Sequence, residues 1–171
     1  LVIFHSLNGG RLILFEIFMN RKDDLLIKWV VGLSAGYVTL LWLLMTMGDQ
    51  SVTALVFWLF STAIATCMAM ITLNRLHQSG SGVFWKTQRV SATYLLLMVP
   101  AHMLFMHLNA SIGRDTQTII ERMHHPFIKF VDLTLVIGGL FHGSYGLISI
   151  QQDYLKSNRL RICFGVPVFL V

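Results

Sequence analysis

The sequence predicts an all-α integral membrane protein, a helical bundle with about five to six transmembrane helices. Of the 171 residues, 55% are hydrophobic and only 12% are charged, and the mean hydropathy is +0.67. This composition is typical of chains that are embedded in lipid. The apolar residues also gather in runs, and several runs are long enough to cross about 30 Å of hydrocarbon. Soluble fold classes are therefore excluded.

Six apolar runs define the expected elements, at about 1–19, 25–47, 51–73, 87–109, 126–150 and 160–171. The middle four have the length of a full span. The first and last are cut short by the ends of the sequence, so we expect a longer native polypeptide. A linker-like segment, 74–86, divides a single membrane-anchor domain, 1–171, into a first half, 1–73, and a second half, 87–171.

The basic residues predict the orientation of the helices in the membrane. Ten lie near one side of the expected bundle and three near the other, which is the bias of a positive cytoplasmic side. The ten are Arg11, Arg21, Lys22, Lys28, Arg75, Lys86, Arg89, Lys156, Arg159 and Arg161, and the three are Arg114, Arg122 and Lys129. The net charge of +5 is thus a topology signal, with membrane lipid and no nucleic acid as partner.

Two apolar runs carry the same pattern, a histidine followed four residues later by glycine and eleven residues later by a carboxylate. The copies are His5, Gly9, Glu16 and His142, Gly146, Asp153. A histidine in a membrane helix is costly and indicates a function. Since each lies about 16 Å from its carboxylate, the two imidazoles should lie at similar depth. The pattern resembles a two-histidine haem clamp, although either histidine taken alone is more often a helix–helix hydrogen-bonding residue than a ligand.

The fourth run begins with basic and aromatic residues and carries a further histidine. His102 follows Arg89 by thirteen residues, about 20 Å along a helix. This arrangement suits a cofactor with charged substituents at the inner interface. Trp85, Lys86 and Arg89 are equally well explained as interfacial anchors.

Other polar residues in the spans give no sign of a metal cluster or an ion path. Cys67 and Cys163 lie in apolar runs without C-x-x-C spacing, so we expect neither a zinc site nor an iron–sulfur cluster in this chain. Asp132 is interpreted as a helix-start residue in preference to part of a proton path.

Three segments carry a resemblance to the membrane anchors of succinate:quinone oxidoreductase, or complex II. Residues 132–161, with the sequence LFHGSYGL followed by QDY, resemble the haem-binding helix of the small anchor subunit. Gln88-Arg89-Val90-Ser91 with His102 resembles the preceding helix of that subunit. The segment from His5 to Arg11, ending at Glu16, is similar to a helix of the cytochrome b556-type anchor. The chain therefore looks like a fused or extended form of the two anchor subunits.

The resemblance implies a b-type cytochrome that passes electrons between an iron–sulfur subunit and membrane quinone in a succinate dehydrogenase or fumarate reductase. It implies haem b ligation by His5 and His142, and His102 as a ligand if a second haem is present. Arg11 and Arg89 match positions near the haem propionates. The implied quinone residues are Tyr154, Asp153 and Ser91.

The same resemblance implies an assembly and a location. FAD and the iron–sulfur clusters would belong to the flavoprotein and iron–sulfur partner subunits, and the complex would lie in a bacterial or archaeal cytoplasmic membrane. Two alternatives stay open: a haem-free anchor that shapes a quinone site, and an unrelated transporter or channel subunit. The near absence of buried acids in the spans disfavours the second alternative.

Overall fold

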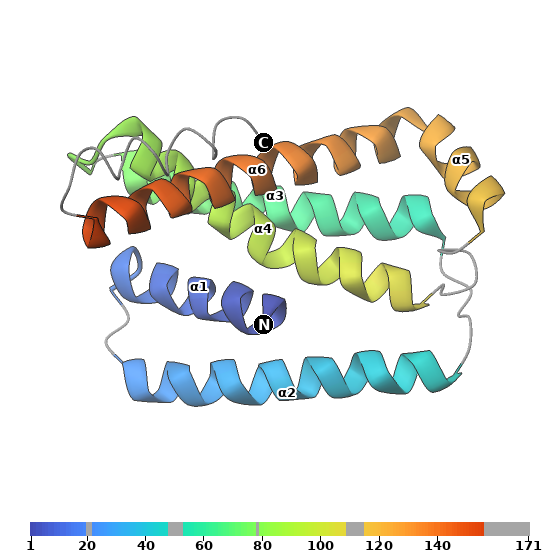
Figure 1. Ribbon diagram of the computed structural model, residues 1–171, viewed down its shortest axis with the longest axis horizontal. Helices are drawn as coiled ribbons and strands as arrows, with labels where there is room; N and C mark the ends of the chain where they lie inside the picture. The colour runs from blue at the N-terminus through green and yellow to red at the C-terminus, as the bar shows by residue number, and fades with distance from the viewer. Residues whose placement is uncertain (20–21, 48–52, 78, 109–114, 156–171) are drawn as a thin grey trace.

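The computed structural model describes residues 1–19, 22–47, 53–77, 79–108 and 115–155, and the regular elements in these ranges are all helices (Figure 1). They are α1 (Val2–Glu16), α2 (Asp23–Met47), α3 (Ala54–His77), α4 (Val83–Leu108), α5 (Thr116–His124) and α6 (Pro126–Tyr154). The predicted all-α class is therefore confirmed.

Four of these helices, α2, α3, α4 and α6, are long and apolar enough to cross a membrane. They coincide with the four full-length runs expected from the sequence, although α3 continues to His77 and α4 already begins at Val83. The first run forms α1, which has 15 residues. The run expected at 160–171 lies outside the described residues. The chain is thus a multi-pass membrane protein.

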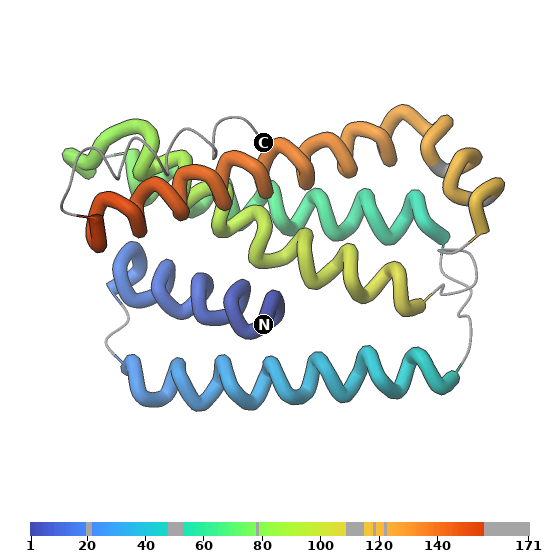
Figure 2. The backbone as a smooth tube through the Cα atoms, viewed as in Figure 1, coloured from blue at the N-terminus to red at the C-terminus, as the bar shows by residue number. Residues whose placement is uncertain are grey.

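Successive long helices run in opposite directions, as Figures 1 and 2 show. One end of the bundle, at the left of Figure 1, holds the C-terminal ends of α1, α3 and α6 and the N-terminal ends of α2 and α4. We call this the basic end, because Arg11, Lys22, Arg75 and Arg89 belong to it. The short helix α5 lies at the opposite end. The arrangement agrees with the charge bias of the sequence.

Helix α4 is the centre of the bundle, since it contacts α1, α2, α3 and α6. A core of buried side chains joins α3, α4 and α6, among them Trp58, Met98 and Val131. Many large apolar side chains instead face outward, as expected for helices surrounded by lipid. Between α3 and α4, the buried hydroxyls of Thr72 and Thr93 lie 3.1 Å apart and form an interhelical hydrogen bond.

Candidate functional site

A cavity of about 670 Å³ lies between α1, α4 and α6. Within the described residues the backbones of α1 and α6 make no close contact with each other, although both contact α4. The cavity thus separates the two helices that carry the repeated histidine pattern. Its size is within the range of about 300–1,000 Å³ that is typical of cofactor and ligand sites.

His5 from α1 and His142 from α6 face each other across this cavity. Both line it, and their ring centroids are 6.4 Å apart with the ring planes at 70°. With metal–imidazole bonds of about 2 Å, two histidines on opposite sides of one iron place their ring centroids roughly 6 Å apart. The expectation that the two imidazoles lie at similar depth is therefore confirmed, and their separation fits a shared metal.

Three glycines widen the cavity beside these histidines. Gly9 of α1 and Gly139 and Gly143 of α6 line it, and a Cβ atom added at any of them would meet no atom within 4 Å. They therefore face open space and do not serve as helix–helix contacts. Gly146 differs, because its added Cβ would lie 3.6 Å from the Gln88 amide nitrogen of α4. Of the two glycines in the repeat, only Gly9 borders the cavity.

His102 of α4 lines the same cavity and lies against Trp58 of α3, with ring centroids 5.9 Å apart. The Nδ1 atoms of His102 and His142 are both buried, and neither has a hydrogen-bond partner among the described residues. Buried polar atoms normally have partners. His102 and His142 thus bring two histidines whose Nδ1 atoms lack a described partner to the lining of one cavity.

Arg89 lies at the basic end, in an ion pair that joins α4 to α1. Its Nη2 atom is 2.7 Å from the Glu16 carboxylate, and its guanidinium lies 5.2 Å from the centre of the Trp85 ring. A haem propionate at Arg89, as the resemblance predicts, would therefore compete with the Glu16 carboxylate for the same guanidinium. Sequence reasoning named both residues but did not pair them, because the pairing depends on how α1 and α4 are rotated.

Arg11 faces away from the histidine cavity. It pairs with Asp23 at the start of α2, donates a 2.9 Å hydrogen bond to Asn8, and lines a second cavity between α1, α2, α3 and α4. The predicted contact between Arg11 and a haem propionate remains a prediction that rests on the family resemblance.

The three predicted quinone residues all lie toward the basic end of the bundle. Tyr154 is the last residue of α6, and it and Asp153 are both exposed. Ser91 is half-buried on α4 and donates a 3.0 Å hydrogen bond to the Gln88 carbonyl. None of the three borders either large cavity. The end of α6 is therefore exposed within the part of the chain that the structure describes.

Two further polar residues, one bonded to the backbone of His142 and one on the cavity wall, were not predicted as part of the site. The Gln88 amide donates a 3.1 Å hydrogen bond to the backbone carbonyl of His142 and so ties α6 to α4 beside the histidine. Asp132 lines the cavity, and it is not a helix-start residue, because α6 begins at Pro126 with His125 as its N-cap. Both could have been found as polar residues inside apolar spans.

Four helices that are long and apolar enough to cross a membrane, with a histidine-lined cavity in the bundle, define a helical membrane protein with a candidate ligand site. The model of the succinate dehydrogenase/fumarate reductase transmembrane subunit family matches residues 75–170. The match covers more than half of the chain, including all of α4, α5 and α6, and the chain belongs to this family. It is therefore a membrane anchor of the complex II type. Comparison with curated proteins gave no significant match, and comparison with solved structures gave none either.

Proposed function

We propose that this chain is the cytochrome b anchor of a succinate:quinone oxidoreductase and passes electrons between an iron–sulfur subunit and membrane quinone. The observation that carries the proposal is the pair His5 and His142, whose ring centroids lie 6.4 Å apart in a cavity that is also lined by glycines. A haem bound by two histidines has no open iron position and supplies one-electron transfer. The chain belongs to the matched family through its second half, whereas His5 comes from the unmatched first half.

In this proposal each side chain has a distinct task. His5 and His142 would ligate the haem iron, and the glycines would leave room for a flat ring against the backbone. Arg89 offers positive charge at the basic end, where carboxylates of the cofactor would be desolvated. His102 would serve as a ligand only if the chain carries a second haem. Dicarboxylate chemistry, FAD and the clusters belong to the flavoprotein and iron–sulfur partners.

The haem assignment is tested on the purified complex by a pyridine haemochrome assay and a reduced-minus-oxidised spectrum. We expect at least one haem b per chain, and we expect His5→Ala and His142→Ala each to abolish or strongly shift the spectrum. The matched control is His77→Ala, an exposed histidine at the end of α3 that borders neither cavity. Two haems per chain would assign His102 to the second.

A haem-free anchor is the second candidate, and one observation favours it. Arg89 and Arg11, the residues matched to the propionates, already pair with Glu16 and Asp23. A pure and active complex without haem absorption would establish this candidate and overturn the cytochrome. Membership of the family leaves no support for an unrelated transporter or channel.

The quinone assignment rests on Tyr154 at the exposed end of α6. Losing one hydrogen bond of about 1–1.5 kcal/mol to the quinone carbonyl should lower kcat/KM for quinone roughly tenfold in Tyr154→Phe. Tyr145→Phe is the control, because Tyr145 stacks between Phe84 and Phe141. If Tyr154→Phe and the control give the same quinone reductase activity and inhibitor affinity, the assignment is wrong.

A further inference from the structure

The second cavity, at the basic end of the bundle, is not explained by the proposed function. It has a volume of about 400 Å³ and lies between α1, α2, α3 and α4. Leu96 of α4 borders both cavities, and the side chain of Leu96 is packed so tightly against Gly10 that a Cβ there would lie 2.9 Å from it. This contact forms a wall between the two spaces. The two cavities are therefore separate, and a ligand in one does not extend into the other.

The lining of the second cavity is almost entirely apolar. Its polar lining residues already have partners: the hydroxyls of Thr72 and Thr93 bond to each other, and Arg11 pairs with Asp23 and bonds to Asn8. Water needs two to four polar partners to be stable in a cavity, and the apolar side chains that make up the rest of the lining offer none. The walls of the second cavity therefore suit a hydrocarbon chain.

The cavity borders the lipid side of the bundle, because several of its lining residues are exposed. Leu14 is 40% exposed on α1, Leu33 is 51% exposed on α2 and Ile71 is 47% exposed on α3. A chain from the surrounding bilayer can therefore enter between these helices.

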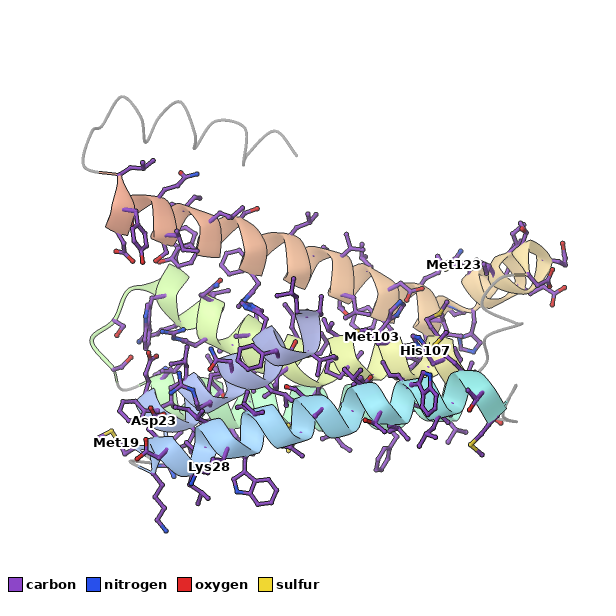
Figure 3. The ribbon with its side chains drawn as sticks, turned by 60° about the horizontal axis from the view of Figure 1, so that its bottom comes forward. Met19, Asp23, Lys28, Met103, His107 and Met123 are labelled. Atoms are coloured by element: carbon purple, nitrogen blue, oxygen red, sulfur yellow. The ribbon has the colours of Figure 1, made fainter. Side chains whose placement is uncertain are left out.

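Positive charge lies at the rim of this cavity. The guanidinium of Arg75, near the end of α3, is 5.7 Å from the centre of the Phe18 ring, which itself lines the cavity. Arg75 is exposed and forms no ion pair within the described residues. Lys28 projects from the same end of α2, as Figure 3 shows. Basic pockets between helices on the cytoplasmic side attract anionic lipid headgroups.

We propose that the second cavity binds an anionic phospholipid, with an acyl chain among α1, α2 and α3 and its phosphate beside Arg75. Phe18 then contacts the first methylenes of the chain while Arg75 lies over its ring. The apolar walls supply the affinity for the chain, and the guanidinium supplies the preference for negative charge. The bound lipid then packs between α1, α2 and α3.

The test is native mass spectrometry of the intact complex after exchange into equal amounts of phosphatidylglycerol and phosphatidylcholine with identical chains. Wild type should retain phosphatidylglycerol in preference to phosphatidylcholine. Arg75→Gln should lower the ratio of the two lipids to about one, because only the charge contact is lost. Ile71→Trp should fill the mouth of the cavity and reduce retention of both lipids.

Two control variants make these results specific. Lys86→Gln removes a basic side chain from the same end of the bundle, outside the lining of the cavity, and Ile137→Trp enlarges an exposed residue of α6 that borders neither cavity. Both should retain lipid as wild type does. The proposal is overturned if wild type shows no preference, if Arg75→Gln or Ile71→Trp behaves like its control, or if the retained species is a quinone.

Discussion

Replacing Gly143 with alanine should raise the stability of the haem-free chain while weakening haem binding. Gly143 lies in the middle of α6, and a Cβ atom added there meets nothing within 4 Å. Alanine in a helix interior is favoured over glycine by about 0.8–1.0 kcal/mol. Because no atom is displaced, the unliganded protein should gain most of that free energy of unfolding.

The opposite sign is expected once a flat ring occupies the cavity. A methyl group forced into an occupied, well-packed space costs about 1–3 kcal/mol, which corresponds to a loss of affinity of roughly 5- to 150-fold. The assay is the rate of haem transfer from the purified complex to excess apomyoglobin, followed spectrally. A parallel denaturant titration of the haem-depleted chain gives the stability.

Gly36→Ala on α2 is the matched control for this prediction. Gly36 also has no atom within 4 Å of an added Cβ, but it borders neither cavity. Its stability should rise as that of Gly143→Ala does, with haem transfer unchanged. If Gly143→Ala and Gly36→Ala release haem at the same rate, the inference that a ring rests on Gly143 is refuted.

Three further measurements address the packing of the bundle. Met98→Ala removes a fully buried core side chain and should lower the free energy of unfolding by about 2–5 kcal/mol in a denaturant titration; a loss below that range would mean that the core collapses around the site. Thr72→Val breaks the hydrogen bond to Thr93 and should cost about 0.6 kcal/mol, at most about 1.7, by the same assay. In a double-mutant cycle of Glu16→Gln and Arg89→Gln, we expect a coupling energy of about 0.5–3 kcal/mol, whereas additive single effects would argue against the ion pair.

The helical spans could be predicted from the sequence because hydropathy and length alone determine them. The boundaries were less accurate where the helix enters the interface. Helix α4 begins at Val83, four residues before the expected run. The apolar run starts later because Trp85 and Lys86, which belong to the helix, are amphipathic or polar. Helix α5 lies between the expected runs 87–109 and 126–150, and its nine residues are too few and too polar to give an apolar run.

The sequence predicted how far along the bundle the site residues lie, but not which face of its helix each side chain occupies. Counting residues along a helix placed His5 and His142 at the same level, and the 6.4 Å between their rings agrees. The same counting could not tell which face each side chain occupies. Arg11 therefore lies on the second cavity, and Gly146 packs against Gln88 while Gly143 borders the first cavity.

The ion pair of Glu16 and Arg89 would have different consequences in a cytochrome and in a haem-free anchor. A haem propionate at Arg89 would bring a second carboxylate to one guanidinium, and two carboxylates that share a site disfavour each other's charged forms. Removing the Glu16 charge would then relieve that repulsion and slow the release of haem. In a haem-free anchor no second carboxylate arrives, so the same change only weakens the link between α1 and α4. In a chain that binds haem, slower haem release from Glu16→Gln than from wild type therefore identifies Glu16 as a competitor for the propionate, whereas unchanged or faster release identifies the pair as a structural link alone.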